Sequence, residues 1–378
     1  MPTLRERLTG GPRRVVGLDV ARGLAVLGMF TAHVGVVDVD EATLWLTVAD
    51  GRSSVLFALV AGVSLALVTG GARPLTGDAL VHARGRLLVR AVLLLVVVAL
   101  LDLLGTRILL ILGFYAAYFV LALPFLTWGP RRLAALAVVV AVVGPPLALW
   151  GPVALVRAGL HLPDDGSGAV TDFVLTGHYP AVVWMAYVFA GMAIGRCDLS
   201  PSVLRTRLLV GGLAATVVGY GFSVGVYGDP AREAAVRDQV SATSGTGAWS
   251  DPWPTPLYLA LPGPHEESWT EVLGTAGFAV AVLGACLVVG RVGSVVLAPL
   301  AAVGSMALTA YSLQVVAVWH WDLMDDVTSN GPLVLMTVVT LAAATAWRAA
   351  WGRGPLERLF TAVAVRNAPA PTADRPAA

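Results

Sequence analysis

The sequence predicts an all-α polytopic membrane protein with about ten transmembrane helices and with both termini in the cytoplasm. Of its 378 residues, 57% are hydrophobic and only 13% are charged, and the mean hydropathy is +0.78. A soluble domain usually carries about 25% charged residues. Apolar segments recur along the chain, and arginine is unevenly distributed between them. The composition and the recurring apolar segments predict the membrane fold, and the arginine distribution predicts its orientation.

Ten apolar segments are long enough to cross the hydrocarbon layer, which needs about 20 residues. The sixth segment is short, and the ninth contains Pro299, so the ninth is either one span or two pieces. In chain order, the predicted spans are 16–37, 53–70, 87–104, 108–126, 133–150, 181–195, 208–227, 272–289, 296–319 and 333–351.

The charged residues segregate to opposite sides of these ten spans. Arginine supplies all 25 basic residues, and 19 of them fall on the side of the two termini, whereas 18 of the 24 acidic residues fall on the other side. Because basic residues are enriched in cytoplasmic loops, the termini are predicted to be cytoplasmic. Asp19 and Arg22 interrupt the first span, which is therefore expected to remain as a helix rather than be cleaved as a signal peptide.

The chain is expected to form one transmembrane domain over residues 1–366, followed by a disordered tail over 367–378. The tail, NAPAPTADRPAA, has a composition typical of disorder. Two long extracytoplasmic segments are predicted near 151–180 and 228–270. Such segments either cap a site or serve as solvated connections, and the sequence leaves both interpretations open.

Several classes of function lack support. The net charge of +1 and the absence of an arginine-rich stripe with interleaved aromatic residues argue against nucleic acid as a partner. No HExxH, CxxC, GxSxG or Walker pattern is present, and no metal is expected. Cys197 lies at a predicted membrane edge and Cys286 inside an apolar run, which disfavours both a disulfide and thiolate ligation.

The first span, LDVARGLAVLGMFTAHVG, carries three polar side chains that the bilayer disfavours, and such residues tend to mark function. Asp19 and Arg22 are one helical turn apart and can form an ion pair. Arg22 and His33 are eleven residues apart, so they share one helix face at a separation of about 16 Å. The alternative is that Asp19 and Arg22 reach the cytoplasmic headgroups while His33 packs at the outer interface.

The Arg22 to His33 spacing resembles the signature of the transmembrane acyltransferase superfamily, which includes acyltransferase family 3 and heparan-alpha-glucosaminide N-acetyltransferase. Further stretches resemble bacterial heparan-alpha-glucosaminide N-acetyltransferase-like and YeiB-like membrane proteins: TVADGRSSVLFALVAGVSLAL, HYPAVVWMAYVFAGMAIGR, ALTAYSLQVVAVW and GPLERLF. The resemblance implies a multi-pass protein of the cell membrane. It also implies transfer of an acyl group, expected to be acetyl, from cytoplasmic acyl-CoA to an extracytoplasmic acceptor such as a sugar or envelope glycan.

One segment departs from that family. The eukaryotic N-acetyltransferase has a reactive histidine before its TVAD-like segment, but here the corresponding VDVDEATLWLTVAD contains none. His33 is therefore expected to act instead, which is closer to acyltransferase family 3. Histidine suits a general base because it titrates near working pH.

Further candidates lie at the outer ends of the spans. Asp50 and Arg52 precede the second span and are candidates to orient His33 or hold the acceptor, or else they form a helix cap and an interfacial arginine. His178 and Tyr179 open the sixth span and are candidates to complete the outer site, although an interfacial aromatic belt also explains the tyrosine.

The acyl-CoA donor is expected to bind on the cytoplasmic side. Arg84, Arg86 and Arg90, between the second and third spans, are candidates for its phosphate groups, with help from Arg131 and Arg132. The alternative is that these arginines only determine topology.

Two other sets of polar residues are given structural interpretations. An interhelical hydrogen-bonding role is expected for three residues of the ninth span, Tyr311, Ser312 and Gln314. Four further residues are interpreted as solvated loop residues: His161, His265, Glu266 and Glu267.

A second class of function uses the same residues differently. In a transporter or flippase, Asp19, Arg22 and His33 would form a proton relay or a substrate path. Matched helix interruptions in both halves of the chain would favour transport, and the sequence has no clear pair of them.

Overall fold

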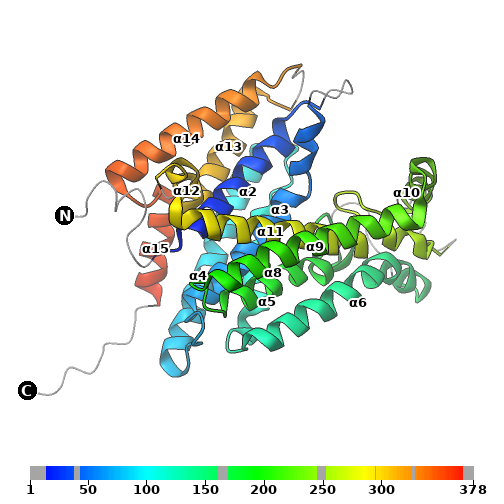
Figure 1. Ribbon diagram of the computed structural model, residues 1–378, viewed down its shortest axis with the longest axis horizontal. Coiled ribbons are helices and arrows are strands. Elements are labelled where there is room, and N and C mark those ends of the chain that lie inside the picture. Colours follow the sequence, from blue (N-terminus) through cyan, green and yellow to red (C-terminus); the bar gives the residue numbers. More distant parts are fainter. Residues whose placement is uncertain are drawn as a thin grey trace, which may run out of the picture.

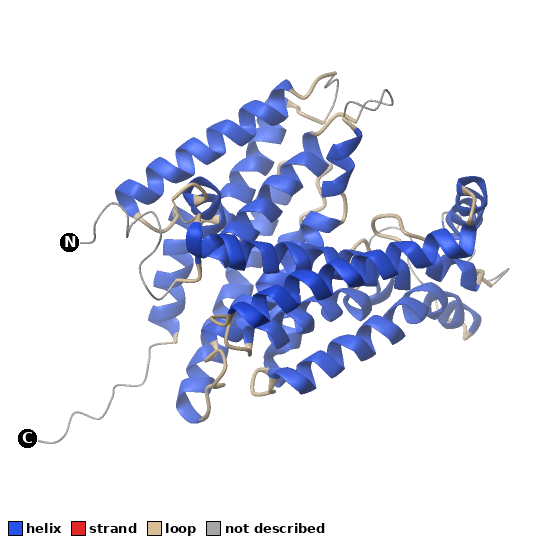
Figure 2. Ribbon diagram, viewed as in Figure 1, coloured by secondary structure: helices blue, strands red, loops and turns tan. Residues whose placement is uncertain are grey.

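The computed structural model describes residues 14–37, 43–160, 169–244, 253–293, 295–324 and 328–368. Within these ranges every regular element is a helix (Figure 2). The all-α membrane architecture predicted from composition is confirmed in this general form. The single-domain boundary stays a prediction, and most of the predicted tail, residues 369–378, lies outside the described residues.

Each predicted span coincides with a helix. The helices that correspond to the spans, in chain order, are α2 (Val16–Val34), α3 (Arg52–Val68), α4 (Gly77–Asp102), α5 (Ile111–Ala122), α6 (Pro130–Arg157), α8 (Ala181–Gly195), α9 (Ser202–Tyr227), α11 (Trp269–Val292), the pair α12 (Ala298–Ser305) and α13 (Ala307–Trp321), and α14 (Gly331–Trp351). The shorter elements are η1 (Leu44–Ala49), η2 (Leu123–Phe125), α7 (Ala169–Thr171), η3 (Asp172–Thr176), α10 (Pro230–Ser244), η4 (Pro256–Ala260) and α15 (Pro355–Asn367).

The number of membrane crossings stays a prediction. By length and apolar composition, five of the described helices qualify as spans, or up to seven if each of two bent pairs counts as one. The other predicted spans are shorter or carry more polar residues. The orientation of the termini is likewise a prediction.

The ninth span is indeed two pieces, α12 and α13, which meet at an angle of 83°. The break does not fall at Pro299, which occupies the first turn of α12, where its missing N–H costs nothing. It falls at Met306, between the two helices. The carbonyl groups at the end of α12 therefore need partners from elsewhere in the protein.

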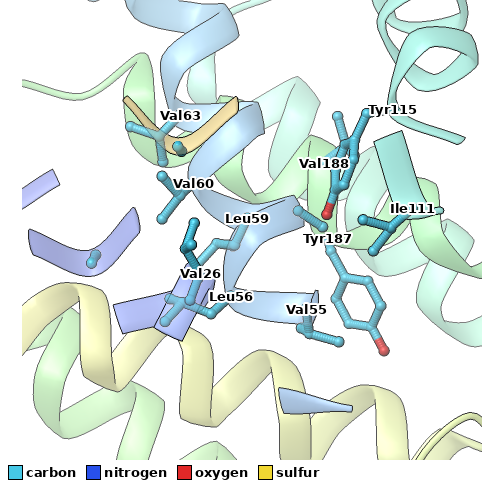
Figure 3. Close-up of a cluster of buried hydrophobic side chains, with 14 of the residues drawn as sticks. Val26, Val55, Leu56, Leu59, Val60, Val63, Ile111, Tyr115, Tyr187 and Val188 are labelled. Atoms are coloured by element: carbon cyan, nitrogen blue, oxygen red, sulfur yellow. The ribbon is translucent and has the colours of Figure 1, made fainter. Parts of the chain in front are cut away.

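Helix α3 is the centre of the structure. In the stretch Leu44–Val68, 72% of the apolar window is buried, against 17% in α9 and in α14. Figure 3 shows Leu59 and Val60 of α3 in one buried cluster with Val26 of α2, Tyr115 of α5 and residues of α8. Helix α11 crosses α2 and α3 and continues alongside α9, helices α9 and α6 extend away from this centre, and α10 lies beyond the end of α9 (Figure 1).

Glycines allow the central helices to approach closely. A Cβ atom at Gly191 of α8 would collide with the Leu59 carbonyl of α3, and one at Gly304 of α12 would collide with the Asp19 carbonyl of α2. In a membrane, where hydrophobic burial does not drive helices together, small residues at contacts give the close packing that does. These contacts hold α2 and α3, which carry the candidate site, in fixed positions.

The predicted orientation can be tested by cysteine labelling. In a background lacking Cys197 and Cys286, single cysteines at Arg73 and Arg205 should be protected from an impermeant thiol reagent in intact cells, because the arginine bias places them inside. A cysteine at Asp238, on the exposed surface of α10, should be labelled. Labelling of either arginine position without lysis would contradict the ten-span topology.

Candidate functional site

Asp19 and Arg22 pair within α2, as their spacing predicts. The Arg22 Nη1 lies 3.4 Å from the Asp19 Oδ1, and Arg14 approaches the same carboxylate with its Nε at 2.5 Å and its Nη2 at 3.1 Å. The Asp19 side chain is only 6% exposed. Two arginines thus compensate one buried carboxylate, and this end of α2 carries net positive charge.

Arg22 also connects three helices. Its Nη1 donates to the Gly304 carbonyl at 3.0 Å, and its Nη2 donates to the Ser64 hydroxyl of α3 at 2.6 Å. The Gly304 carbonyl is available because α12 ends there. The guanidinium therefore holds α2 against α3 and against the break between α12 and α13.

A pocket of about 400 Å³ opens beside Arg22. Its walls come from α2, α3, α4, α5, α15 and the α12–α13 break, and they include four arginines together with apolar and aromatic side chains. The arginines are Arg14, Arg22, Arg90 and Arg353, and the larger apolar residues include Phe57, Leu87, Leu94, Leu112, Phe119 and Phe360.

Two of these arginines are suited to binding an anion. Among the described residues, no hydrogen bond is found for the guanidinium of either Arg90 or Arg353. The acidic residue of the lining, Glu357, is engaged elsewhere, because its carboxylate accepts from the Thr309 N–H at 3.1 Å and from the Thr309 hydroxyl at 2.6 Å. Guanidinium groups gathered at one pocket favour a negatively charged, hydrogen-bond-accepting ligand.

The predicted donor cluster lies within a helix rather than in a loop, since α4 begins at Gly77, ahead of the predicted start. Of the three arginines, Arg90 lines the pocket. Arg84 donates to the Leu123 carbonyl at 3.3 Å, and Arg86 donates to the Ala368 carbonyl at 2.9 Å. Arg90 therefore lines the pocket, whereas Arg84 and Arg86 are hydrogen-bonded to backbone carbonyls.

His33 lies at the opposite end of α2, where the side chain of Gln314 meets it. The Gln314 amide nitrogen is 2.7 Å from the His33 Nδ1, and the Tyr311 ring stands nearly edge-on at a centroid distance of 6.5 Å. The interhelical hydrogen-bonding role expected for this part of the ninth span is confirmed for Gln314. His33 is thus held between α2 and α13.

Asp50 and Arg52 precede and begin α3, but the described bonds of Arg52 do not lead to His33. The Arg52 Nε donates to the Tyr220 hydroxyl of α9 at 3.0 Å, and its Nη1 donates to the Thr47 carbonyl at 3.3 Å. The guanidinium also lies 5.0 Å from the Tyr220 ring centroid. Arg52 therefore joins α3 to α9, and the expected role in orienting His33 finds no direct contact.

His178 belongs to a second cluster, with a histidine that the sequence analysis placed in a solvated loop. Its exposed ring stacks on that of His265 at 3.8 Å, and the His265 ring lies parallel to the Trp184 ring at 6.0 Å. Tyr179 packs edge-on against all three rings. Among the described residues, His178 and His33 make no ring contact with each other.

The solvated-loop interpretation is wrong for His265, Glu266 and Glu267, while His161 lies outside the described residues. The Glu266 carboxylate accepts from the Arg237 Nε at 2.5 Å and from the Gly263 N–H at 2.6 Å. The Glu267 carboxylate accepts from the Trp184 indole at 3.3 Å. The loop folds back because the two Glu271 carboxylate oxygens accept the backbone N–H groups of His265 and Glu267.

This folded loop combines a strained backbone with titratable side chains whose pKa values are shifted. His265 and Glu267 both have left-handed backbone, with φ of 60° and 55°, which costs energy in residues other than glycine. Burial, together with the neighbouring His178, lowers the pKa of His265 to about 3. Burial raises the pKa of Glu267 well above its ordinary value, and the nearby Glu271 carboxylate raises it further.

Aromatic side chains connect the pocket to both histidine clusters. Tyr115 lines the pocket and packs edge-on against Tyr118 at 5.8 Å, and the Tyr118 hydroxyl donates to the Tyr179 carbonyl at 2.6 Å. On the other side, Tyr311 follows the pocket-lining Leu308 by one turn of α13 and meets His33. The sequence analysis did not identify the pocket residues Arg353 and Glu357 or the role of His265, because no local pattern links them to α2.

The fold and the site define a helical membrane protein with an arginine-lined internal pocket at one end of a charged helix. A family model described as "Heparan-alpha-glucosaminide N-acetyltransferase, catalytic" matches residues 14–216, just over half of the chain. The chain belongs to this family, as the sequence resemblance implied, and is in general terms a membrane acetyltransferase-type protein. No match was found among curated proteins or among solved structures. The matched region contains α2 to α8 and part of α9, whereas Gln314 and Arg353 lie outside it.

The lowered pKa of His265 makes the stability of the loop depend on pH. Between about pH 6.5 and pH 3 the unfolded chain takes up a proton at this residue and the folded protein does not, so stability falls as pH falls. The contribution of His265 alone should fall by about 2 kcal/mol between pH 7 and pH 5, whereas Glu267, whose pKa is raised in the folded protein, acts in the opposite direction. His265→Asn, which tolerates the left-handed backbone, should therefore melt in detergent with a smaller decrease between pH 7 and pH 5 than the unchanged protein.

Replacing the exposed His320 by asparagine is the matched control and should leave the pH dependence as it was. If His265→Asn keeps the full decrease in melting temperature, His265 is not the buried neutral group described here.

Proposed function

We propose that this protein transfers an acyl group, expected to be acetyl, from an acyl-CoA bound in the arginine-lined pocket to an acceptor that arrives at His33. The observation that carries the proposal is the arrangement along α2, with an anion-binding pocket at Arg22 and a hydrogen-bonded histidine eleven residues further on. The family match supports acetyl transfer in general. The donor, the acceptor and the location in the cell membrane belong to the proposal.

The pocket suits the chemistry of coenzyme A. Arg90 and Arg353 are available to bind phosphate groups with paired hydrogen bonds, and the apolar lining from α3, α4 and α5 suits the pantetheine arm. Arg22 is held by Asp19, Gly304 and Ser64, so it adds a fixed positive charge to the pocket, which favours an anionic ligand.

His33 is proposed as the general base. Its Nδ1 meets Gln314, so Nε2 is the nitrogen proposed to accept the proton from an acceptor hydroxyl or amine, in the tautomer that carries its hydrogen on Nδ1. The acceptor is expected to be a small molecule or glycan. His178, which is exposed and stacked on His265, is proposed as a further contact for the acceptor. Asp50 stays a candidate as well, and Arg52 supports the site through its contact with α9.

Transport is a second candidate, and one observation favours it. Two bent helix pairs occur within the described part of the chain, α7 and η3 with α8 at 63°, and α12 with α13 at 83°. Interrupted helices that frame a binding site are frequent in secondary transporters. A transporter has no need of an acyl-CoA, so binding of the donor separates the two functions.

Donor binding can be measured as thermal stabilisation, because a ligand that binds the folded form raises its apparent melting temperature. Acetyl-CoA should stabilise the purified protein, and free acetate should not. In Arg90→Ala with Arg353→Ala, the shift should be largely lost, since phosphate-binding guanidinium groups are removed from the pocket.

Arg84→Ala with Arg86→Ala removes the same charge from residues bonded to backbone, and is the matched control that should retain most of the shift. Equal losses in both double variants would mean that the arginines act only through net charge. Absence of any shift with acetyl-CoA in the unchanged protein would favour transport.

The role of His33 can be tested directly. His33→Gln should insert at normal abundance but lose labelled acetyl transfer to extracted envelope glycans or lipids by about 100-fold to 10,000-fold, the usual cost of losing a general base. Its stabilisation by acetyl-CoA should be unchanged, because the donor pocket lies at the other end of α2. Transfer at the unchanged rate would assign His33 to packing alone.

A further inference from the structure

The contact between Gln314 and His33 has a chemical consequence. Gln314 is 2% exposed, its amide nitrogen lies 2.7 Å from the His33 Nδ1, and its amide oxygen is buried without a hydrogen-bond partner. A glutamine amide offers a donor on one side and an acceptor on the other. The amide therefore decides which nitrogen of the imidazole carries the proton.

The two orientations of the amide have opposite effects on catalysis. When the amide nitrogen donates to Nδ1, the ring proton must be on Nε2, which then has no lone pair to accept a proton. When the amide turns by 180°, its oxygen accepts from Nδ1–H and Nε2 is free to act as a base. Both orientations occupy the same space, since the two amide ends are nearly the same size.

We propose that Gln314 is a positioning residue that sets the tautomer of His33, with its amide oxygen on Nδ1–H in the catalytically competent state. This inference rests on the proposed function. In the transfer step, the acceptor oxygen or nitrogen bonds to the acyl carbon and its proton passes to Nε2 of His33. The carbon–sulfur bond breaks, its electron pair leaves on the coenzyme A thiolate, and the thiolate finally takes the proton.

Within the described residues, the other polar side chains of this region are not hydrogen-bonded to the His33 ring. Tyr311 presents its ring edge from the same helix, α13. Thr31 of α2 donates its hydroxyl to the Leu27 carbonyl, and the Asn330 side chain bonds both backbone groups of Val36. Asp50, which follows η1, and Arg52, the first residue of α3, have no ion pair with His33 within the described residues. Gln314 is accordingly the hydrogen-bond partner of His33 that the structure shows.

Two substitutions separate tautomer control from a packing role. Gln314→Glu places a carboxylate that only accepts, which should fix the proton on Nδ1, keep transfer active, and move the acid side of the pH–rate profile upward by about one unit. Gln314→Leu keeps the volume but removes the amide, and should lower kcat by about tenfold or more with KM for acetyl-CoA unchanged.

Ser312→Ala, a neighbouring buried change on α13, is the matched control and should alter neither the rate nor the pH profile. Transfer by Gln314→Glu with an unshifted profile, or by Gln314→Leu at the unchanged rate, would overturn the proposal. If Gln314→Leu does not insert, the profile of Gln314→Glu decides alone. The His33→Gln variant separates the proposed function from this inference. Full activity of His33→Gln would reject His33 as the base. Loss of activity in His33→Gln, together with unchanged activity and pH profile in the Gln314 variants, would reject only the control of the tautomer by Gln314.

Discussion

The architecture depends on how the protein satisfies backbone carbonyls at helix ends and breaks in an apolar environment. Each unsatisfied carbonyl there costs several kcal/mol, because lipid offers no hydrogen bonds. Buried arginines supply the donors. Arg22 bonds Gly304 at the end of α12, and Arg348 bonds Ala301 one turn earlier. Arg196, directly after α8, bonds Ala66 near the end of α3 at 2.8 Å and Gly71 just beyond it at 2.9 Å.

The same constraint places the candidate site. The break between α12 and α13 admits Arg22 to the interior, and the interior position of Arg22 brings Asp19 and Arg14 with it. A charge on a membrane helix costs about 2.5 to 3.5 kcal/mol on insertion scales, so it persists where it has a partner or a function. Here Arg22 has both, since it closes the break and forms part of the pocket wall. Replacing it therefore affects fold and pocket together, whereas Arg90 and Arg353 are separable from the fold.

What the sequence could predict was local. The helical segments follow from runs of apolar residues, and the Asp19 to Arg22 pair follows from a three-residue spacing, because both depend on neighbours along the chain. The contact between Gln314 and His33 joins residues 281 positions apart, and no spacing rule reaches that far. The loop around His265 was misread for a related reason. Its polar composition is that of a solvated segment, and only the distant Trp184 and the capping by Glu271 show that it is buried.

The two ends of α2 lie a fixed distance apart, and this limits how the proposed donor can serve both of them. Arg22 and His33 are separated by about 16 Å along one helix, and the glycine contacts of α2 with α12 leave no room for the helices to slide closer. The pocket-lining residues Ala307 and Leu308 stand one turn from Tyr311, whose buried ring reaches His33. Because packed helices resist separation, the proposed transfer requires the donor, rather than α2, to bridge this distance.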